Sequence, residues 1–229
     1  MATRSPRFLA ATLAVLALVA AGLAWWSQDD RLTRGGASST QPLTATDDRI
    51  DPANEGRLVR VEGRLGVEGV AIDTELGISS DAALMLREVE MYQWHERCLA
   101  DACTHSVAWS SEPVDSARFT EPAGHLNPTP FPLLAARFSA PTLRLGAFRV
   151  APDLLVALPS VPRPVSAAEL APNLAASFRD VEGVLFSGDD PANPAVGDLR
   201  VRYHIVATGP VTLTGVQRGE WLTPAAGTD

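Results

Sequence analysis

Apolar and polar residues alternate with a period of two in several segments of this chain, and this alternation is the strongest constraint on its fold. In the longest run, Leu199, Val201 and Tyr203 alternate with arginine and histidine residues. Because successive side chains of a strand point to opposite faces, such runs predict half-buried β-strands. The alternating segments are residues 59–65, 143–146, 199–205 and 211–214.

Signals for helices are weaker than signals for strands. Pro152 opens a short apolar run that ends near Leu158, and Ser166 and Glu169 have the spacing of a capping box. Pro172 stops this second run, because proline cannot continue the interior of a helix. We therefore predict a mainly β (α+β) domain with short helices.

The amino-terminal segment is apolar over residues 8–26, where Thr12 is the only polar side chain. A helix of this length spans about 28 Å, close to the ~30 Å hydrocarbon core of a bilayer. Arg4 and Arg7 precede it, which predicts a cytoplasmic amino terminus and a non-cytoplasmic (periplasmic or extracellular) main domain. The alternative is a cleaved signal peptide, for which residues 22–24 offer a small-x-small site.

Charge excludes several function classes. The formal net charge is −8, and all 19 basic residues are arginine. A surface that binds nucleic acid needs clustered positive charge, so no nucleic-acid partner is predicted. Schiff-base catalysis and phosphate binding by a P-loop both require a lysine, which this sequence lacks.

Cys98 and Cys103 are the only two cysteines of the chain. In an exported protein such a pair favours a disulfide, closing a short ring at the tip of a hairpin. The alternative is a metal site in which His95 and His105 join the two thiolates, a ligand set that Zn²⁺ accepts. This spacing matches no standard zinc finger, and no metal site is predicted.

One short pattern occurs twice, 120 residues apart: Val-Glu-Gly-x-Leu begins at Val61 and again at Val181. Each copy reads as the opening of a strand followed by a turn. The repeat raises the hypothesis of an ancient duplication that gave two similar β lobes. The competing interpretation is that strand ends containing glycine resemble one another without common origin.

Several blocks, in order, resemble the transmembrane protein 43 (LUMA-like) family. The most distinctive is Met91-Tyr92-Gln93-Trp94 with the residues just before it. The seven matching blocks are residues 50–59, 86–94, 109–112, 124–128, 145–148, 193–201 and 217–224. Together they cover nearly all of the predicted exported part.

The resemblance implies an amino-terminal span, a large non-cytoplasmic domain and further spans near the carboxyl end. The last feature is missing before Asp229, so we expect either a single-pass relative or a truncated chain. The predicted parts are a cytoplasmic terminus (1–7), a transmembrane signal-anchor helix (8–26), a flexible linker (27–48), a β-rich family-like domain (49–225) and a tail (226–229).

No catalytic motif was found in the sequence, and the family resemblance supplies no catalytic residues. We therefore predict no catalytic, cofactor-binding or metal-binding residues and no cofactor. Tyr92, Trp94 and Trp109 surround one predicted hairpin, where they form either core or an interaction patch. His125 is expected to be a turn residue that hydrogen-bonds backbone, rather than a ligand or base.

The predicted function is that of a membrane-anchored, non-enzymatic structural or scaffold protein. Its exported domain would mediate self-association or the assembly of envelope proteins, with the membrane, a homo-oligomer or other envelope proteins as partners. One alternative is a module that binds lipid or another envelope ligand in a pocket between two β lobes. The other is an exported hydrolase or metal-binding protein.

Overall fold

The computed structural model describes residues 41–100 and 102–225 of the chain. Apart from Gln41, these residues belong to one compact unit, Pro42–Asp229. The predicted anchor (8–26) and tail (226–229) lie outside the described residues. Within the described part, no helix has the length and apolar character needed to cross a membrane.

The described residues are mainly β, as predicted, with a few short helices. The strands are β1 (Leu43–Ala45), β2 (Leu58–Glu68), β3 (Ala71–Asp73), β4 (Ile78–Ser80), β5 (Leu84–Leu99), β6 (Ala102–Ser110), β7 (Ala136–Ser139), β8 (Thr142–Leu145), β9 (Phe148–Val150), β10 (Val161–Arg163), β11 (Arg179–Val181), β12 (Val184–Phe186), β13 (Leu199–Val206), β14 (Gly209–Arg218) and β15 (Trp221–Thr223). The helices are η2 (Pro52–Asn54), η3 (Ser116–Arg118), η4 (Pro152–Ala157), η5 (Ala167–Glu169) and α2 (Pro172–Ala175).

The first sheet closes on itself. β2 pairs with β14 along one edge and with β8 along the other, and β15 and β9 complete the ring. β1 adds to β2 in parallel, with Leu43 opposite Val59, although it lies inside the predicted linker 27–48. Apolar side chains that alternate along these strands fill the ring. They include Val59, Val61, Leu65, Leu145, Phe148, Leu213 and Leu222.

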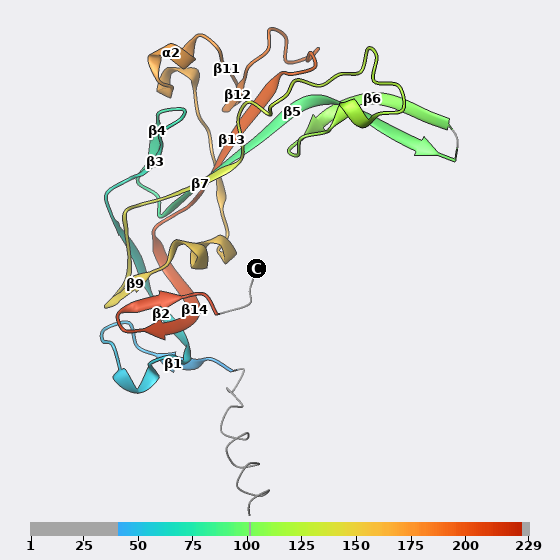
Figure 1. Cartoon of the computed structure of the whole chain (residues 1–229). Helices are drawn as coiled ribbons and strands as arrows, with labels where there is room; N and C mark the ends of the chain where they lie inside the picture. The colour runs from blue at the N-terminus through green and yellow to red at the C-terminus, as the bar shows by residue number, and fades with distance from the viewer. Residues whose placement is uncertain (1–40, 101, 226–229) are drawn as a thin grey trace, which may run out of the picture. The chain divides into compact units, whose positions relative to one another are not determined.

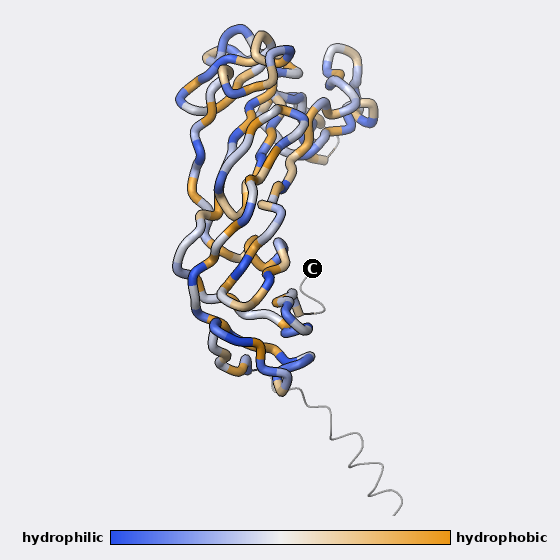
Figure 2. The backbone as a smooth tube through the Cα atoms, turned by 90° about the vertical axis from the view of Figure 1, so that its left-hand side faces the viewer, coloured by the Kyte–Doolittle hydropathy of each residue, from blue (hydrophilic) through white to orange (hydrophobic). Residues whose placement is uncertain are grey.

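The second sheet has the strand order β11-β12-β13-β5-β6, with β10 added to β13 and β7 added to β5. β5 is its longest strand and runs antiparallel to β13 and to β6 (Figure 1). Blue and orange alternate along the strands in Figure 2, which is the period-two pattern of the sequence. A second apolar cluster lies against this sheet. Its buried members include Ile78, Met85, Val89, Met91, Leu185 and Val201.

The two sheets share part of their core. The apolar cluster of the ring includes Ala83 just before β5, Leu84 at the start of β5 and Val206 at the end of β13. The Ala83 N–H donates to the Val206 carbonyl at 3.0 Å, and the Ala140 N–H donates to the Ala83 carbonyl at 3.2 Å. The start of β5, which we call its base, is therefore hydrogen-bonded within its own sheet and packed into the core of the ring.

The repeated Val-Glu-Gly pattern does not mark equivalent structure. The first copy lies in the middle of β2, where Gly63 is extended and a Cβ atom would come within 2.5 Å of the Asp47 carboxylate. The second copy forms the turn between β11 and β12, with positive φ at Glu182 (54°) and Gly183 (80°). The expectation that both copies open a strand and a turn is wrong for the first, because one glycine provides space and the other provides a turn conformation.

The weak helix signals became short helices. The run at Pro152 forms η4, a 3₁₀ helix rather than a longer α-helix. Ser166 precedes η5, and its backbone N–H donates to Glu169 Oε1 at 2.9 Å, as half of a capping box. A new helix, α2, starts at Pro172, a residue whose fixed φ suits the first turn.

Candidate interaction site

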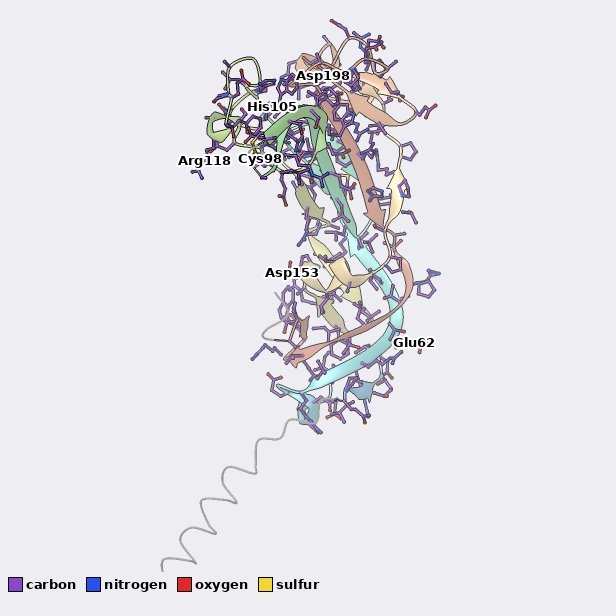
Figure 3. All side chains as sticks on the ribbon, turned by 90° about the vertical axis from the view of Figure 1, so that its right-hand side faces the viewer. Glu62, Cys98, His105, Arg118, Asp153 and Asp198 are labelled. Carbon is purple, nitrogen blue, oxygen red and sulfur yellow. A yellow bond between two sulfur atoms is a disulfide. The ribbon has the colours of Figure 1, made fainter. Side chains whose placement is uncertain are left out.

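The β5–β6 hairpin is the part of the domain where the predicted site residues gather. Residues 91–99 of β5 pair with residues 102–110 of β6 in continuous register. The distal half of this hairpin extends beyond the other strands of its sheet in Figure 1. Cys98, His105 and Arg118 lie together at this end of the unit in Figure 3, well away from Glu62 and Asp153.

Cys98 and Cys103 form the favoured disulfide, with their Cα atoms 4.0 Å apart. They are directly opposite each other in the register of the hairpin. The alternative metal site is not assembled, because both sulfurs are consumed by the bond. In addition, His95 differs from Cys98 by an odd number of residues, so its side chain points to the opposite face of the strand.

Aromatic and imidazole rings cover one face of the hairpin. The rings of His105 and His125 stack with centroids 3.9 Å apart, and Trp94 meets His125 edge-on at 4.7 Å. Phe119 adds a fourth ring, 5.6 Å from His105. His125 also places Nδ1 3.0 Å from the Glu121 carbonyl, so it does bond to backbone in its turn. The ring stack itself had no sequence signal, since its members come from a strand and a distant loop.

Glu96 ties the loop to this face. Its Oε2 accepts the Thr120 N–H at 2.7 Å and lies 3.1 Å from His105 Nε2. Partial burial of the carboxyl acts to raise the pKa of Glu96. The hydrogen bonds from Thr120 and His105 outweigh burial, so this pKa is lower than usual. The carboxylate is therefore held in its charged, hydrogen-bonded form at neutral pH.

Asn127 covers the edge of β5 where β13 has ended. Its Oδ1 accepts the Trp94 N–H at 2.7 Å, and its Nδ2 donates to the Trp94 carbonyl at 3.0 Å. Nδ2 is also 3.3 Å from the Val114 carbonyl, and the Asn127 N–H donates to the Ser116 hydroxyl at 2.8 Å. One side-chain amide thus makes the pair of bonds that a neighbouring strand would make.

The structure separates the three predicted patch residues into two groups. Tyr92 and Trp109 contact each other with centroids 5.2 Å apart, while Trp94 packs on His125. Trp109 is further held by the Arg200 guanidinium, 4.1 Å above its ring. All three side chains are half-buried. Their role in binding a partner remains a prediction.

β5 carries the carboxylates of Glu88 and Glu90 on one face, and Glu90 takes part in ion pairs. Glu90 Oε2 lies 2.9 Å from the Arg200 guanidinium and 2.5 Å from that of Arg202, both on β13. Glu88 lies 3.5 Å from His204 of the same strand. Cross-strand pairing of Glu90 with the two arginines stabilises this sheet face, so the Glu90 carboxylate is engaged rather than poised for acid–base chemistry.

A buried polar network lies at the base of β5 and had not been predicted. Arg87 Nη1 donates to Asp73 Oδ2 at 2.6 Å, and the Tyr203 hydroxyl donates to the same oxygen at 2.6 Å. Asp73 Oδ1 accepts the N–H groups of Glu75 and Leu76, and Arg87 also pairs with Glu75. Asp73 is 0% exposed, and Arg87 and Tyr203 are each 2% exposed.

The charges of this network fix its protonation. Burial together with the neighbouring Asp73 carboxylate raises the pKa of Tyr203 far above its ordinary value. Burial would lower the pKa of Arg87, but the carboxylates of Glu75 and Asp73 raise it instead. The one available signal was an arginine whose second neighbours along the chain, Met85 and Val89, are apolar, but sequence alone could not name its partner.

The sequence also matches a known protein family. The model of the family described as transmembrane protein 43 matches residues 91–228, more than half of the chain. This match includes the paired part of the β5–β6 hairpin (residues 91–110), the loop that covers it and β13.

The chain belongs to the transmembrane protein 43 family.

Its relatives include transmembrane protein 43 of Rattus norvegicus, which is 29% identical over 197 residues, covering 76% of this chain and 49% of the relative. The Homo sapiens protein is 28% identical over the same shares. The transmembrane protein 43 homolog of Drosophila melanogaster is 25% identical over 175 residues, covering 69% of this chain and 45% of the homolog. This family member thus spans about half the length of these curated relatives, and no solved structure matches it.

Proposed function

We propose that this family member is a membrane-anchored, non-enzymatic scaffold whose β-rich domain self-associates or assembles envelope proteins outside the cytoplasm. The observation that carries the proposal is the distal β5–β6 hairpin. It extends beyond its sheet, is closed by a disulfide and is braced by a loop bonded to Glu96 and Trp94. Such a rigid projection loses little conformational entropy on binding, which favours docking.

The non-enzymatic part of the proposal rests on how the polar groups are used. Among the described residues, the most buried charged groups, Asp73 and Arg87, are paired with each other and with Tyr203. His105 and His125 stack on each other, His105 is bonded to Glu96, and His125 is bonded to backbone. These partners are structural, and no hydroxyl or thiol nucleophile is hydrogen-bonded to a histidine among the described residues.

The membrane part of the proposal rests on the sequence of residues 8–26 and on the family. The experiment extracts the full-length chain from membranes in mild detergent and measures its native and denatured masses. A chain of uncleaved mass, in oligomers or in complex with envelope proteins, supports the scaffold. A chain shortened near Ala24 that is monomeric and without partners overturns it.

A second candidate function, lipid binding, is favoured by one groove of about 670 Å³. It lies beside η4 and β14 of the ring sheet, rather than between two lobes as predicted. Its wall is largely apolar and includes Leu58, Leu154, Val156, Leu158, Leu213 and Pro224. Its size is in the range of small-ligand pockets, and an acyl chain is the chemistry that such a wall accepts.

The lipid candidate is tested by native mass spectrometry of the protein after gel filtration. Val156→Asp places a charge in the groove, while Val161→Asp places one at a similarly exposed valine of β10 outside it. Lipid bound to the wild type and to Val161→Asp, but lost from Val156→Asp, supports the candidate. Wild-type protein without lipid rejects it.

A further inference from the structure

β6 is an edge strand with a free side. Among the described residues it pairs only with β5, and the strand order of the sheet ends with it. Trp94 of β5 makes its backbone bonds with Asn127, on the side away from β6, so Trp94 and Val107 form a non-hydrogen-bonded pair. Bonded and non-bonded pairs alternate in an antiparallel ladder. The residues whose backbone groups point outward are therefore Cys103, His105, Val107 and Trp109.

Other edges of this sheet carry the features that prevent pairing between molecules. β11 has three residues, two of which are Arg179 and Asp180. β10 contains Pro162 and Arg163, and β7 contains Arg137. Short length, charge and proline are the usual protection of an exposed edge. β6 has nine residues, Ala-Cys-Thr-His-Ser-Val-Ala-Trp-Ser, and none is proline, arginine, lysine or an acid.

β6 is also held in place before any partner arrives. The disulfide links the start of β6 to β5, and the ring stack on His105 holds the middle of β6. On its other face, Thr104, Ser106 and Ala108 are exposed and small, so no bulky side chain obstructs an approaching strand. An edge that is already ordered pairs at a lower entropic cost.

We propose that β6 pairs antiparallel with β6 of a second copy of this chain, in the register that places Ser106 opposite Ser106 of the second copy. This inference rests on the proposed function and names the surface of its self-association. In this register Val107 lies opposite His105 and Trp109 opposite Cys103 of the second copy, so every outward residue finds a partner. No like charges face each other, and the predicted anchor keeps the copies in one membrane, which raises their effective concentration.

The register is tested by cysteine crosslinking of the full-length chain in membranes. At Ser106 the new pair is non-hydrogen-bonded, where Cα atoms lie about 4.5 Å apart and a disulfide fits. Ser106→Cys should form a covalent dimer on mild oxidation. Thr104→Cys and Ala108→Cys should each stay monomeric on non-reducing gels but crosslink when coexpressed. Equal crosslinking of Thr104→Cys alone and Ser106→Cys overturns the register.

A charge swap tests the surface without oxidation. Ser106→Lys and Ser106→Glu each put like charges opposite one another, so each variant alone should lose most of its dimer by native mass. Mixing the two should restore a mixed dimer, because the charges then attract. Ser79→Lys, at an exposed serine of β4, is the matched control and should keep the wild-type mass.

The outcomes separate this inference from the broader proposal. If oligomers persist unchanged in Ser106→Lys and no Ser106→Cys crosslink forms, the β6 edge is wrong while self-association stands. If the wild type itself is monomeric, the β6 pairing is wrong. Complexes with other envelope proteins would then still support the scaffold, and their absence would overturn both.

Discussion

The two halves of β5 share one strand but have opposite environments. The proximal half, residues 84–91, lies between β13 and β7, and its Arg87 is buried with Asp73 and Tyr203. The distal half, residues 92–99, has β6 on one edge and the Asn127 amide on the other, and Leu99 at its end is 70% exposed. One continuous strand therefore belongs to the buried core at one end and ends in exposed residues at the other.

The largest expected effect is at the proximal half. Arg87→Met leaves the Asp73 carboxylate buried without its cation, which should lower the free energy of unfolding by about 3–5 kcal/mol. Arg97→Met, at an exposed arginine of the distal half, should change it by no more than about 0.5 kcal/mol. Urea unfolding of both variants measures the difference. Equal effects would show that the two halves are not distinct in stability.

The disulfide should matter only for the distal half. Replacing Cys98 and Cys103 by serine frees a six-residue ring, which the loop-entropy relation values at about 2 kcal/mol. Amide exchange at residues 97–104 should therefore accelerate by about 30-fold, while that of residues 84–91 stays the same. Hydrogen exchange by mass spectrometry makes both measurements. Acceleration along the whole strand would contradict the independence of the two halves.

Loss of the Asn127 amide should have a smaller effect. Asn127→Ala removes the bonds to both backbone groups of Trp94, but water can replace part of them at this edge, so we expect a loss of about 1 kcal/mol. Exchange of the Trp94 amide reports it directly. Asn193→Ala, at an exposed asparagine of a turn, is the control. An unchanged Trp94 amide would mean that Asn127 does not cover this edge.

The two halves should respond to opposite extremes of pH. Because the pKa of Tyr203 is raised in the folded state, its stabilisation is complete below the ordinary value of 10.0 and is lost as pH rises above it. Because the pKa of Glu96 is lowered, its stabilisation is present above the ordinary value of 4.5 and is lost as pH falls below it. Stability at the base of β5 is therefore lost at alkaline pH, and stability at the tip of the hairpin is lost at acid pH.

The alkaline effect at Tyr203 and the acid effect at Glu96 are measured separately. In Tyr92→Phe, where Tyr203 is the only tyrosine left, tyrosinate absorbance should rise only together with unfolding. For the tip, the protection of the Thr120 amide against exchange, relative to its intrinsic rate at each pH, should fall in acid, and Glu96→Gln should remove this pH dependence. Ionisation of Tyr203 in the folded state would refute the alkaline prediction. Protection of the Thr120 amide that does not depend on pH in either protein would refute the acid prediction.

Several strands and the disulfide could be predicted from the sequence. Period-two alternation located β2, β8, β13 and β14, because burying one face of a strand leaves its record in every second residue. The spacing of Cys98 and Cys103 favoured the disulfide at a hairpin tip, and the residues around Met91 indicated the family. These properties are local, so neighbouring residues are enough to determine them.

Tertiary structure alone decided the rest. Asp73, Arg87 and Tyr203 meet through strand pairings that join distant segments, and His105 and His125 stack because a loop returns over the hairpin. The same Val-Glu-Gly sequence lies inside strand β2 in one place and forms the turn between β11 and β12 in the other. Non-local contacts of this kind depend on which strands become neighbours, and a single sequence records side-chain chemistry without recording which distant segments will share a sheet.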